Sequence, residues 1–267
     1  MEKRGQVTVF VIIAIVLVAG VIAVFTLNDG VRDFLSETFM GKDEKAIIIE
    51  NYVNFCLEEA LDKALFYNGL QGGYFITPDN SIYYESENLT LSRNIPYYLD
   101  KSKKILTEED LSDQLSLSVR NNFEECLDFD SLNEINFNLE YDINKINIKS
   151  ILNSDRVKIE LNFPVSINLG EKQILLREFN VEKETNYLLL YFLSIELTDI
   201  QLEYENAICL SCISTLAEEN DLNIGNNEAK GVNESEYVIV YQLNKNNNDK
   251  VEIFSFAHKF YRSENEN

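Results

Sequence analysis

The residues best suited to chemistry in this sequence are its four cysteines and its single histidine. Cys209 and Cys212 form a Cys-Leu-Ser-Cys motif, a spacing typical of a redox-active dithiol when the first thiolate lies at the start of a helix. The flanking Ile208, Leu210 and Ile213 are apolar, and no basic residue adjoins the motif to lower a thiol pKa. We therefore favour a structural disulfide or a pair of buried thiols, with redox chemistry and half of a metal site as the alternatives.

The other two cysteines, Cys56 and Cys126, each lie in a segment whose apolar residues have helical spacing. Four cysteines in an exported chain allow three ways of forming two disulfides. We predict the pairs Cys56–Cys126 and Cys209–Cys212. The first pair would close a long loop, and it would stabilise the fold by restricting the unfolded chain.

Nucleophilic catalysis assisted by histidine depends on His258 alone. This residue lies in an alternating stretch, 254–258, that is typical of a strand side chain rather than of a catalytic base. One histidine is too few for a histidine-built zinc site, and the chain has neither a phosphate-binding glycine loop nor EF-hand spacing. We therefore expect no catalytic residues, no cofactor and no metal site.

A tyrosine-rich stretch between Gly69 and Asp100 is the sequence candidate for ligand contact. It contains a Gly-Gly pair and no sustained helical period, so we expect a long excursion with short strands. Tyrosine rings offer flat amphipathic area that suits carbohydrate or protein recognition, although packing in the core and loops is the simpler explanation for them. The weak ligand-binding set is Tyr83, Tyr84, Tyr97 and Tyr98.

The N-terminal stretch predicts a membrane anchor. Residues 7–27 carry no formal charge and make about 30 Å of helix, which is enough to cross a bilayer. Lys3 and Arg4 precede this stretch and acidic residues dominate after it, so the positive-inside rule places the N-terminus in the cytoplasm. We expect a single-pass protein of the cell membrane with an extracellular C-terminal domain. Sequons at Asn88 and Asn233 are predicted glycosylation positions of that domain.

The formal net charge is −22, and almost all of it follows the apolar stretch. A field of this sign repels nucleic-acid phosphates, so we expect no nucleic-acid partner. It favours solubility and is compatible with the binding of cations or basic partners, but the interpretation that we favour is a solvated surface without a specific partner.

Hydrophobic periodicity predicts an α+β fold behind the anchor. We divide the chain into a basic leader (1–5) that cleavage would remove, an anchor helix (6–27), a stalk (28–42) and an acidic exterior domain (43–267). Within this domain, 43–130 combines helices with the tyrosine-rich excursion, and 186–219 is helical. Thr107 is a predicted helix N-cap. Strict alternation predicts an antiparallel meander over 134–182 and a terminal hairpin over 236–261, so an antiparallel sheet should pack against several helices.

The stretch "KRGQVTVFVIIAIVL" resembles the class III signal peptide of archaeal type IV pilin-like proteins. In both, a basic leader ends in glycine and is followed by glutamine, a hydroxyl residue and an apolar helix. The resemblance implies that a prepilin peptidase cuts between Gly5 and Gln6, and that the remaining helix anchors the subunit and can later pack in a filament. Phe10 stands where major pilins usually carry a glutamate, and residues 28–30 interrupt the long first helix, which indicates a minor, capping or non-polymerising member.

Three further stretches, "ENYVNFCLEEALDKALFYNGLQGGYF", "NNFEECLDF" and "FSFAHKFY", are similar to segments of uncharacterised membrane-anchored proteins from small-genome archaea. This resemblance implies one anchor followed by an exterior α+β domain, without an assigned activity. We predict a non-enzymatic structural or adhesive protein, homo- or hetero-oligomeric in a surface filament or layer. An anchored binding module for a glycan, a solute or a partner-cell surface is the first alternative, and an extracytoplasmic thiol oxidoreductase is the second.

Overall fold

The computed structural model describes residues 42–85, 92–134, 138–170, 172–204, 207–229, 236–247 and 250–261. The chain divides into two compact units, Met1–Ile49 and Glu50–Asn267. Of the first unit, only the opening turns of one helix are described. The predicted leader, the anchor over 7–27 and nearly all of the stalk lie outside the described residues. Among the residues that are described, no helix has the length and apolar character needed to cross a membrane.

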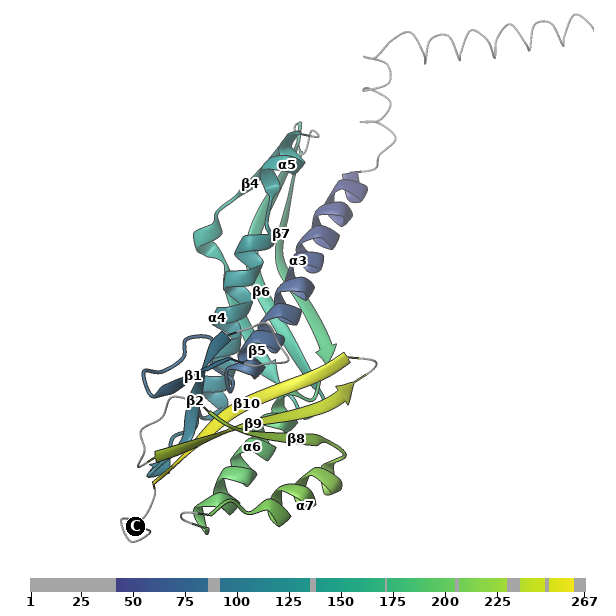
Figure 1. The fold of residues 1–267 in the computed structure, drawn as a ribbon. Helices are drawn as coiled ribbons and strands as arrows, with labels where there is room; N and C mark the ends of the chain where they lie inside the picture. The colour runs from purple at the N-terminus through teal and green to yellow at the C-terminus, as the bar shows by residue number, and fades with distance from the viewer. Residues whose placement is uncertain are drawn as a thin grey trace, which may run out of the picture. The chain divides into compact units, whose positions relative to one another are not determined.

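The second unit is α+β, as predicted, and it contains two sheets (Figure 1). In one sheet the strand order is β1-β2-β10-β9-β8, with β3 paired to β2. In the other sheet β6 pairs with β4, β5 and β7. The strands are β1 (Ser81–Glu85), β2 (Ser92–Asp100), β3 (Ser102–Lys103), β4 (Asn138–Tyr141), β5 (Asn147–Leu152), β6 (Arg156–Leu169), β7 (Lys172–Glu184), β8 (Asn223–Glu228), β9 (Glu236–Asn247) and β10 (Lys250–Tyr261).

The strands of the predicted meander form and pair antiparallel, but only β5, β6 and β7 follow the order of a meander, because β4 pairs with β6 rather than with its chain neighbour β5. Strand β6 is the centre of this sheet, and every second side chain from 157 to 167 is at most 2 % exposed, namely Val157, Ile159, Leu161, Phe163, Val165 and Ile167. The predicted hairpin turn between β6 and β7 contains Gly170, whose φ of 64° is a conformation that glycine adopts without steric cost.

The first sheet is mixed, whereas we expected antiparallel pairing alone. Strand β10 pairs antiparallel with β9, but it pairs parallel with β2. Sequence alternation carries no information about this direction, because β2 and β10 are separated by most of the domain and no tight turn joins them. The pattern also missed β8, because its sequence NIGNNE has almost no apolar residues and the strand forms at an edge.

Helices α3 (Lys42–Leu70) and α4 (Glu108–Cys126) lie side by side in opposite directions (Figure 1). Tyr52 Oη of α3 donates to the carbonyl of Cys126 at 3.1 Å, and Asn68, further along α3, donates to the carbonyl of Gln114 at 3.3 Å. Thr107 caps α4 as predicted, because its Oγ1 accepts from Asp110 N at 3.1 Å. A short helix, α5 (Phe129–Glu134), follows α4 and was not predicted.

Serines of α4 cover the edge of β5. Ser112 Oγ donates to the carbonyl of Ser150 at 2.7 Å, and Ser150 N donates to Ser116 Oγ at 2.9 Å. These bonds occupy backbone groups of β5 that would otherwise be open to pairing with another strand. The helix therefore fixes the second sheet through side-chain hydrogen bonds as well as through its apolar face.

Helix α6 (Tyr187–Leu202) packs against β9 and β10, and α7 (Leu210–Asn220) packs against α6 and β8. Rings from α6, β9, β10 and β2 form an aromatic core in which Tyr98 stacks on Phe256 at 5.0 Å between centroids. Tyr187 and Tyr191 of α6 each contact Phe254. The first sheet is thus held by aromatic packing against α6.

Gly69 allows the backbone of α3 to contact the backbone of β10 directly. A Cβ at this position would overlap the carbonyl oxygen of Ile253. We expect Gly69→Ala to lower the free energy of unfolding by about 1–3 kcal/mol, the usual cost of overpacking. Urea denaturation measures the change. Gly225→Ala is the matched control, because its Cβ would lie 3.9 Å from its nearest neighbours in Gln242 and should cost nothing. Equal losses in both variants would contradict the close approach at Gly69.

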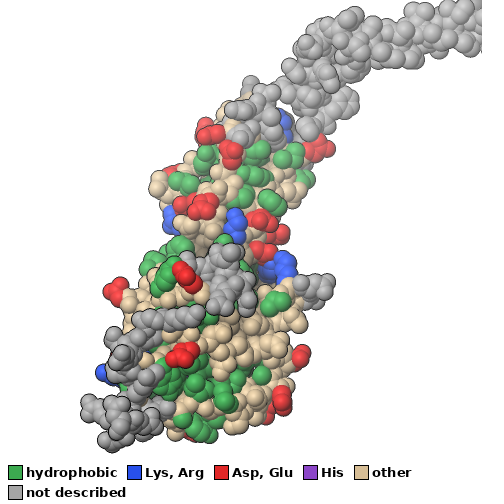
Figure 2. All heavy atoms as spheres, viewed as in Figure 1, with side chains coloured by type: hydrophobic (Ala, Val, Ile, Leu, Met, Phe, Trp, Pro, Cys, Tyr) green, Lys and Arg blue, Asp and Glu red, His purple; other side chains and the backbone are tan. Residues whose placement is uncertain are grey.

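Acidic side chains lie in several separate places on the face shown in Figure 2. The strong negative charge of the chain is therefore not gathered into one patch on the described part of this face.

Candidate functional site

Several predicted site residues fall outside the described residues. These are the processing positions Gly5 and Gln6 and the sequon asparagines Asn88 and Asn233. The four cysteines, the four tyrosines and His258 are all described. The described residues contain no cluster of three or more His, Cys, Asp or Glu side chains that could hold a metal ion.

The cysteines form the two predicted disulfides. Cys56 and Cys126 join the middle of α3 to the last residue of α4, with Cα atoms 5.5 Å apart, and Cys56 is fully buried. Cys209 and Cys212 are bonded at the start of α7, with Cα atoms 5.3 Å apart. Cys209 is the N-cap of α7, and its Sγ accepts a hydrogen bond from Cys212 N at 3.3 Å.

The four tyrosines do not form one binding surface. Tyr98 is fully buried and its hydroxyl donates to the carbonyl of Gly72 at 2.9 Å, so its ring cannot reach a ligand in solvent. Tyr84 and Tyr97 pack against buried residues of the first sheet, whereas Tyr83 is 59 % exposed. Because successive side chains of a strand point to opposite faces, adjacent tyrosines cannot lie on one face.

His258 is a buried strand residue. Its Nε2 lies 2.9 Å from Thr198 Oγ1, and that hydroxyl donates its own proton to the carbonyl of Ser194 at 2.7 Å. Thr198 must therefore accept from Nε2–H, which leaves Nδ1 without a proton and, among the described residues, without a partner. Burial lowers the pKa of His258 from 6.5 to about 3. The imidazole is thus neutral at pH 7, and it packs among rings such as Tyr241.

This burial predicts acid sensitivity. Below pH 6.5 His258 is protonated in the unfolded chain, whereas in the folded chain it becomes protonated only near pH 3. The free energy of unfolding should therefore fall as the pH drops through this window, by up to about 1.4 kcal/mol per pH unit from this residue. Urea denaturation at pH 7, 6 and 5 should show a steeper loss for the wild type than for His258→Gln. Parallel pH profiles would contradict the depressed pKa of His258.

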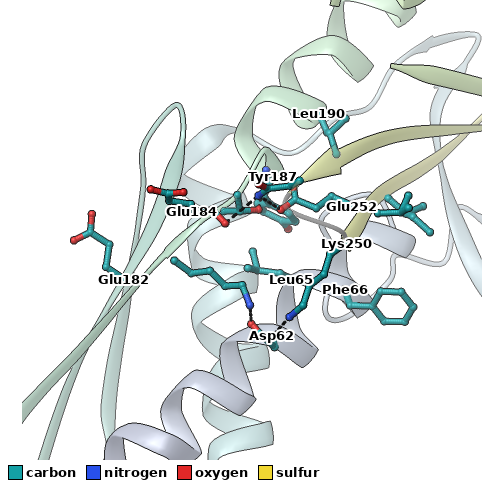
Figure 3. A pocket seen from close by; sticks show the side chains of 14 residues that line it. Asp62, Leu65, Phe66, Glu182, Glu184, Tyr187, Leu190, Lys250 and Glu252 are labelled. Atoms are coloured by element: carbon teal, nitrogen blue, oxygen red, sulfur yellow. Dashed lines mark hydrogen bonds and ion pairs between the residues drawn. The ribbon is translucent and has the colours of Figure 1, made fainter. Parts of the chain in front are cut away.

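A cavity of about 600 Å³ opens where three distant parts of the second unit meet (Figure 3). Helix α3 provides one wall, the end of β7 and the start of α6 provide the second, and the facing ends of β9 and β10 provide the third. Glu252 ties the last two walls together, because its carboxylate accepts from Asn186 N at 2.6 Å and from Asn247 Nδ2 at 3.0 Å. The lining residues of apolar type are Leu65, Phe66, Tyr187, Leu190, Val251 and Ile253.

Two lysines converge on one carboxylate in this cavity. Lys183 and Lys250 both form ion pairs with Asp62. The pair of Lys250 and Asp62, at 3.3 Å, is marked by a dashed line in Figure 3. Burial and then the nearby ammonium of Lys250 lower the pKa of Lys183. The volume lies in the range of small-molecule sites, and the lining mixes apolar and charged groups. This cavity could not be predicted from the sequence, because its lining residues come from segments far apart that share no motif.

The described part of the second unit is thus a disulfide-linked α+β domain with a cavity between helix and strands. No protein family model matches the chain, and neither a curated protein nor a solved structure matches it.

Proposed function

We propose that this chain is a membrane-anchored surface protein with a structural or adhesive role. The observation that carries the proposal is the presence of two disulfides in the domain that follows the apolar stretch. Disulfides persist in oxidising compartments and are rare in the reducing cytosol. They therefore support an exterior location for the residues after 27.

The N-terminal sequence supports the same orientation. Residues 7–27 are long and apolar enough for a single span, and the basic residues Lys3 and Arg4 favour a cytoplasmic N-terminus. The pilin-like order of leader, Gly5, Gln6 and apolar helix supports cleavage on the cytoplasmic side. Such a cut would leave the anchor attached to the exterior domain, which is what a subunit, a tip or a membrane-held component of a surface assembly requires.

Intact mass spectrometry of the full chain from an archaeal host with an active prepilin peptidase tests the processing step. The mature protein is expected to begin at Gln6, and Gly5→Val is expected to retain Met1. Gly20→Val, which changes a glycine inside the apolar stretch, is the matched control and should be cut like the wild type. Retention of Met1 in the wild type, in cells that process a known pilin, would exclude this cleavage.

Labelling of intact cells with a membrane-impermeant amine reagent tests the location. Lysines of the exterior domain should react before lysis to the same extent as after lysis. Co-sedimentation of the protein with sheared surface filaments would support a role in an assembly. A protein that reacts only after lysis would contradict the exterior location, and one that stays monomeric and never sediments with filaments would contradict the assembly role.

A second candidate function, an anchored binding module, is favoured by the cavity beside Asp62. Val251 lines this cavity and is 53 % exposed, so Val251→Trp should fill part of it without disturbing the core. Leu175→Trp, at a 45 % exposed position on β7 that does not line the cavity, is the control. A thermal-shift screen with soluble sugars and amino acids should find compounds that stabilise the wild type and the control but not Val251→Trp. Identical responses of all three proteins would contradict binding in the cavity.

A further inference from the structure

The two disulfides have opposite electrostatic surroundings. Cys209 is the N-cap of α7, an eleven-residue helix, where unpaired N–H groups and the helix dipole stabilise a negative charge. Cys126 is the last residue of α4, where the same dipole disfavours a thiolate. Its partner Cys56 lies inside α3 and is fully buried.

Specific donors surround the sulfur of Cys209. Cys212 N donates to this Sγ at 3.3 Å, and the hydroxyl oxygen of Ser211 lies 3.6 Å from it. Both groups can donate to a thiolate, and such hydrogen bonds stabilise the charged form of the sulfur. These donors stabilise the thiolate of Cys209, and they therefore stabilise the reduced form of the Cys209–Cys212 pair relative to the disulfide.

Cys212 is more accessible to solvent than Cys209, the cysteine whose thiolate is stabilised. Cys209 is 7 % exposed, whereas Cys212 is half-buried and Leu210, between them, is 62 % exposed. An incoming thiol therefore meets Cys212 first, and an exposed apolar side chain adjoins the point of attack. A sulfur whose thiolate is stabilised by hydrogen bonds is also the better leaving group in thiol–disulfide exchange. Accessibility and leaving-group stability thus both direct attack to Cys212.

We propose that Cys209–Cys212 is an exchangeable disulfide that oxidises pairs of thiols on extracytoplasmic peptides or proteins, whereas Cys56–Cys126 is structural. This activity goes beyond the anchoring and assembly role, and it does not depend on processing of the N-terminus. It requires a substrate with two thiols, which act as the reductant.

The reaction balances in two exchange steps. A substrate thiolate attacks Sγ of Cys212, the bond to Cys209 breaks, and Cys209 leaves as a thiolate held by its N–H donor. The second substrate thiolate attacks the substrate sulfur of the mixed disulfide and releases Cys212. Two electrons pass from the substrate to the cysteine pair. Of the two protons that the substrate loses, one ends on Cys212 and the other goes to solvent.

Redox equilibration of the full chain in detergent tests the difference between the disulfides. The protein is incubated in buffers of reduced and oxidised glutathione, quenched with acid and alkylated, and each cysteine is quantified by peptide mass spectrometry. The equilibrium constant for reduction should be at least about tenfold larger for Cys209–Cys212 than for Cys56–Cys126. Reduction of both pairs at the same glutathione ratio, or of Cys56–Cys126 first, would overturn the assignment.

Two single variants test the direction of attack. Cys209→Ser, incubated with oxidised glutathione, should form a mixed disulfide at Cys212, whereas Cys212→Ser should form one slowly at the buried Cys209. Circular dichroism establishes that both variants are folded. The wild type should also oxidise a synthetic peptide with two cysteines, and neither variant should do so. Equal trapping by the two variants would overturn attack at Cys212, and failure of the wild type to oxidise the peptide would overturn the proposed activity.

Discussion

Replacement of Cys56 and Cys126 by alanine is expected to lower the free energy of unfolding by about 4 kcal/mol, the chain-entropy value for a loop of this length. The two residues are separated by 70 positions, so the disulfide removes many conformations from the unfolded chain. Equilibrium urea denaturation measures the loss. The urea dependence of stability should also become steeper, because an unfolded chain without the cross-link exposes more surface.

Contacts beside the disulfide should keep the folded state intact in that variant. Tyr52 Oη donates to the carbonyl of Cys126 at 3.1 Å and accepts from Asp128 N at 2.7 Å, so the end of α4 remains attached to α3. The control is replacement of Cys209 and Cys212 by alanine. Their separation is only three positions, and the same entropy model gives about 2 kcal/mol for so short a loop. Losses of the same size from both pairs would show that loop closure is not the main stabilising effect of Cys56–Cys126.

Tyr98→Ala is expected to lower the free energy of unfolding by about 3–5 kcal/mol, as is usual when a buried aromatic ring is removed. The ring is fully buried, lies 5.0 Å from that of Phe256 and contacts Phe254 at 6.5 Å between centroids. Its hydroxyl also satisfies the carbonyl of Gly72. Tyr98→Phe keeps the ring but leaves this carbonyl without its donor, so a loss of about 1–3 kcal/mol is expected.

Tyr83→Ala is the matched control for the tyrosine experiment. Tyr83 is 59 % exposed, and substitutions at such surface positions usually change stability by less than about 0.5 kcal/mol. Urea denaturation of the three variants separates a structural tyrosine from a surface tyrosine. A small loss for Tyr98→Ala would contradict its place in the core and would reopen its predicted role in ligand contact.

The local sequence pattern was sufficient to predict most helices and strands of the second unit. In residues 157–167 of β6 every second residue is apolar and the residues between them are polar except Pro164. A strand with one buried face is the regular element that places the alternating apolar residues together. Thr107 and the acidic residues that follow it stabilise a helix at its N-terminus, so they predicted the start of α4 correctly. The cysteine pairing followed from the same local reasoning, because two of the cysteines lie three positions apart.

The sequence by itself thus determined the α+β class, the order of most elements, the acidic charge and the apolar N-terminal stretch. Only the tertiary structure decided that β2 runs parallel to β10, that Tyr98 is a core residue, and that Asp62, Lys183 and Lys250 meet around a cavity. The physical reason is the range of the interactions. Periodicity and helix capping involve residues that are close in the sequence, so they can be recognised from the sequence. Strand direction and cavities depend on distant segments that are brought together only by the packing of the whole domain.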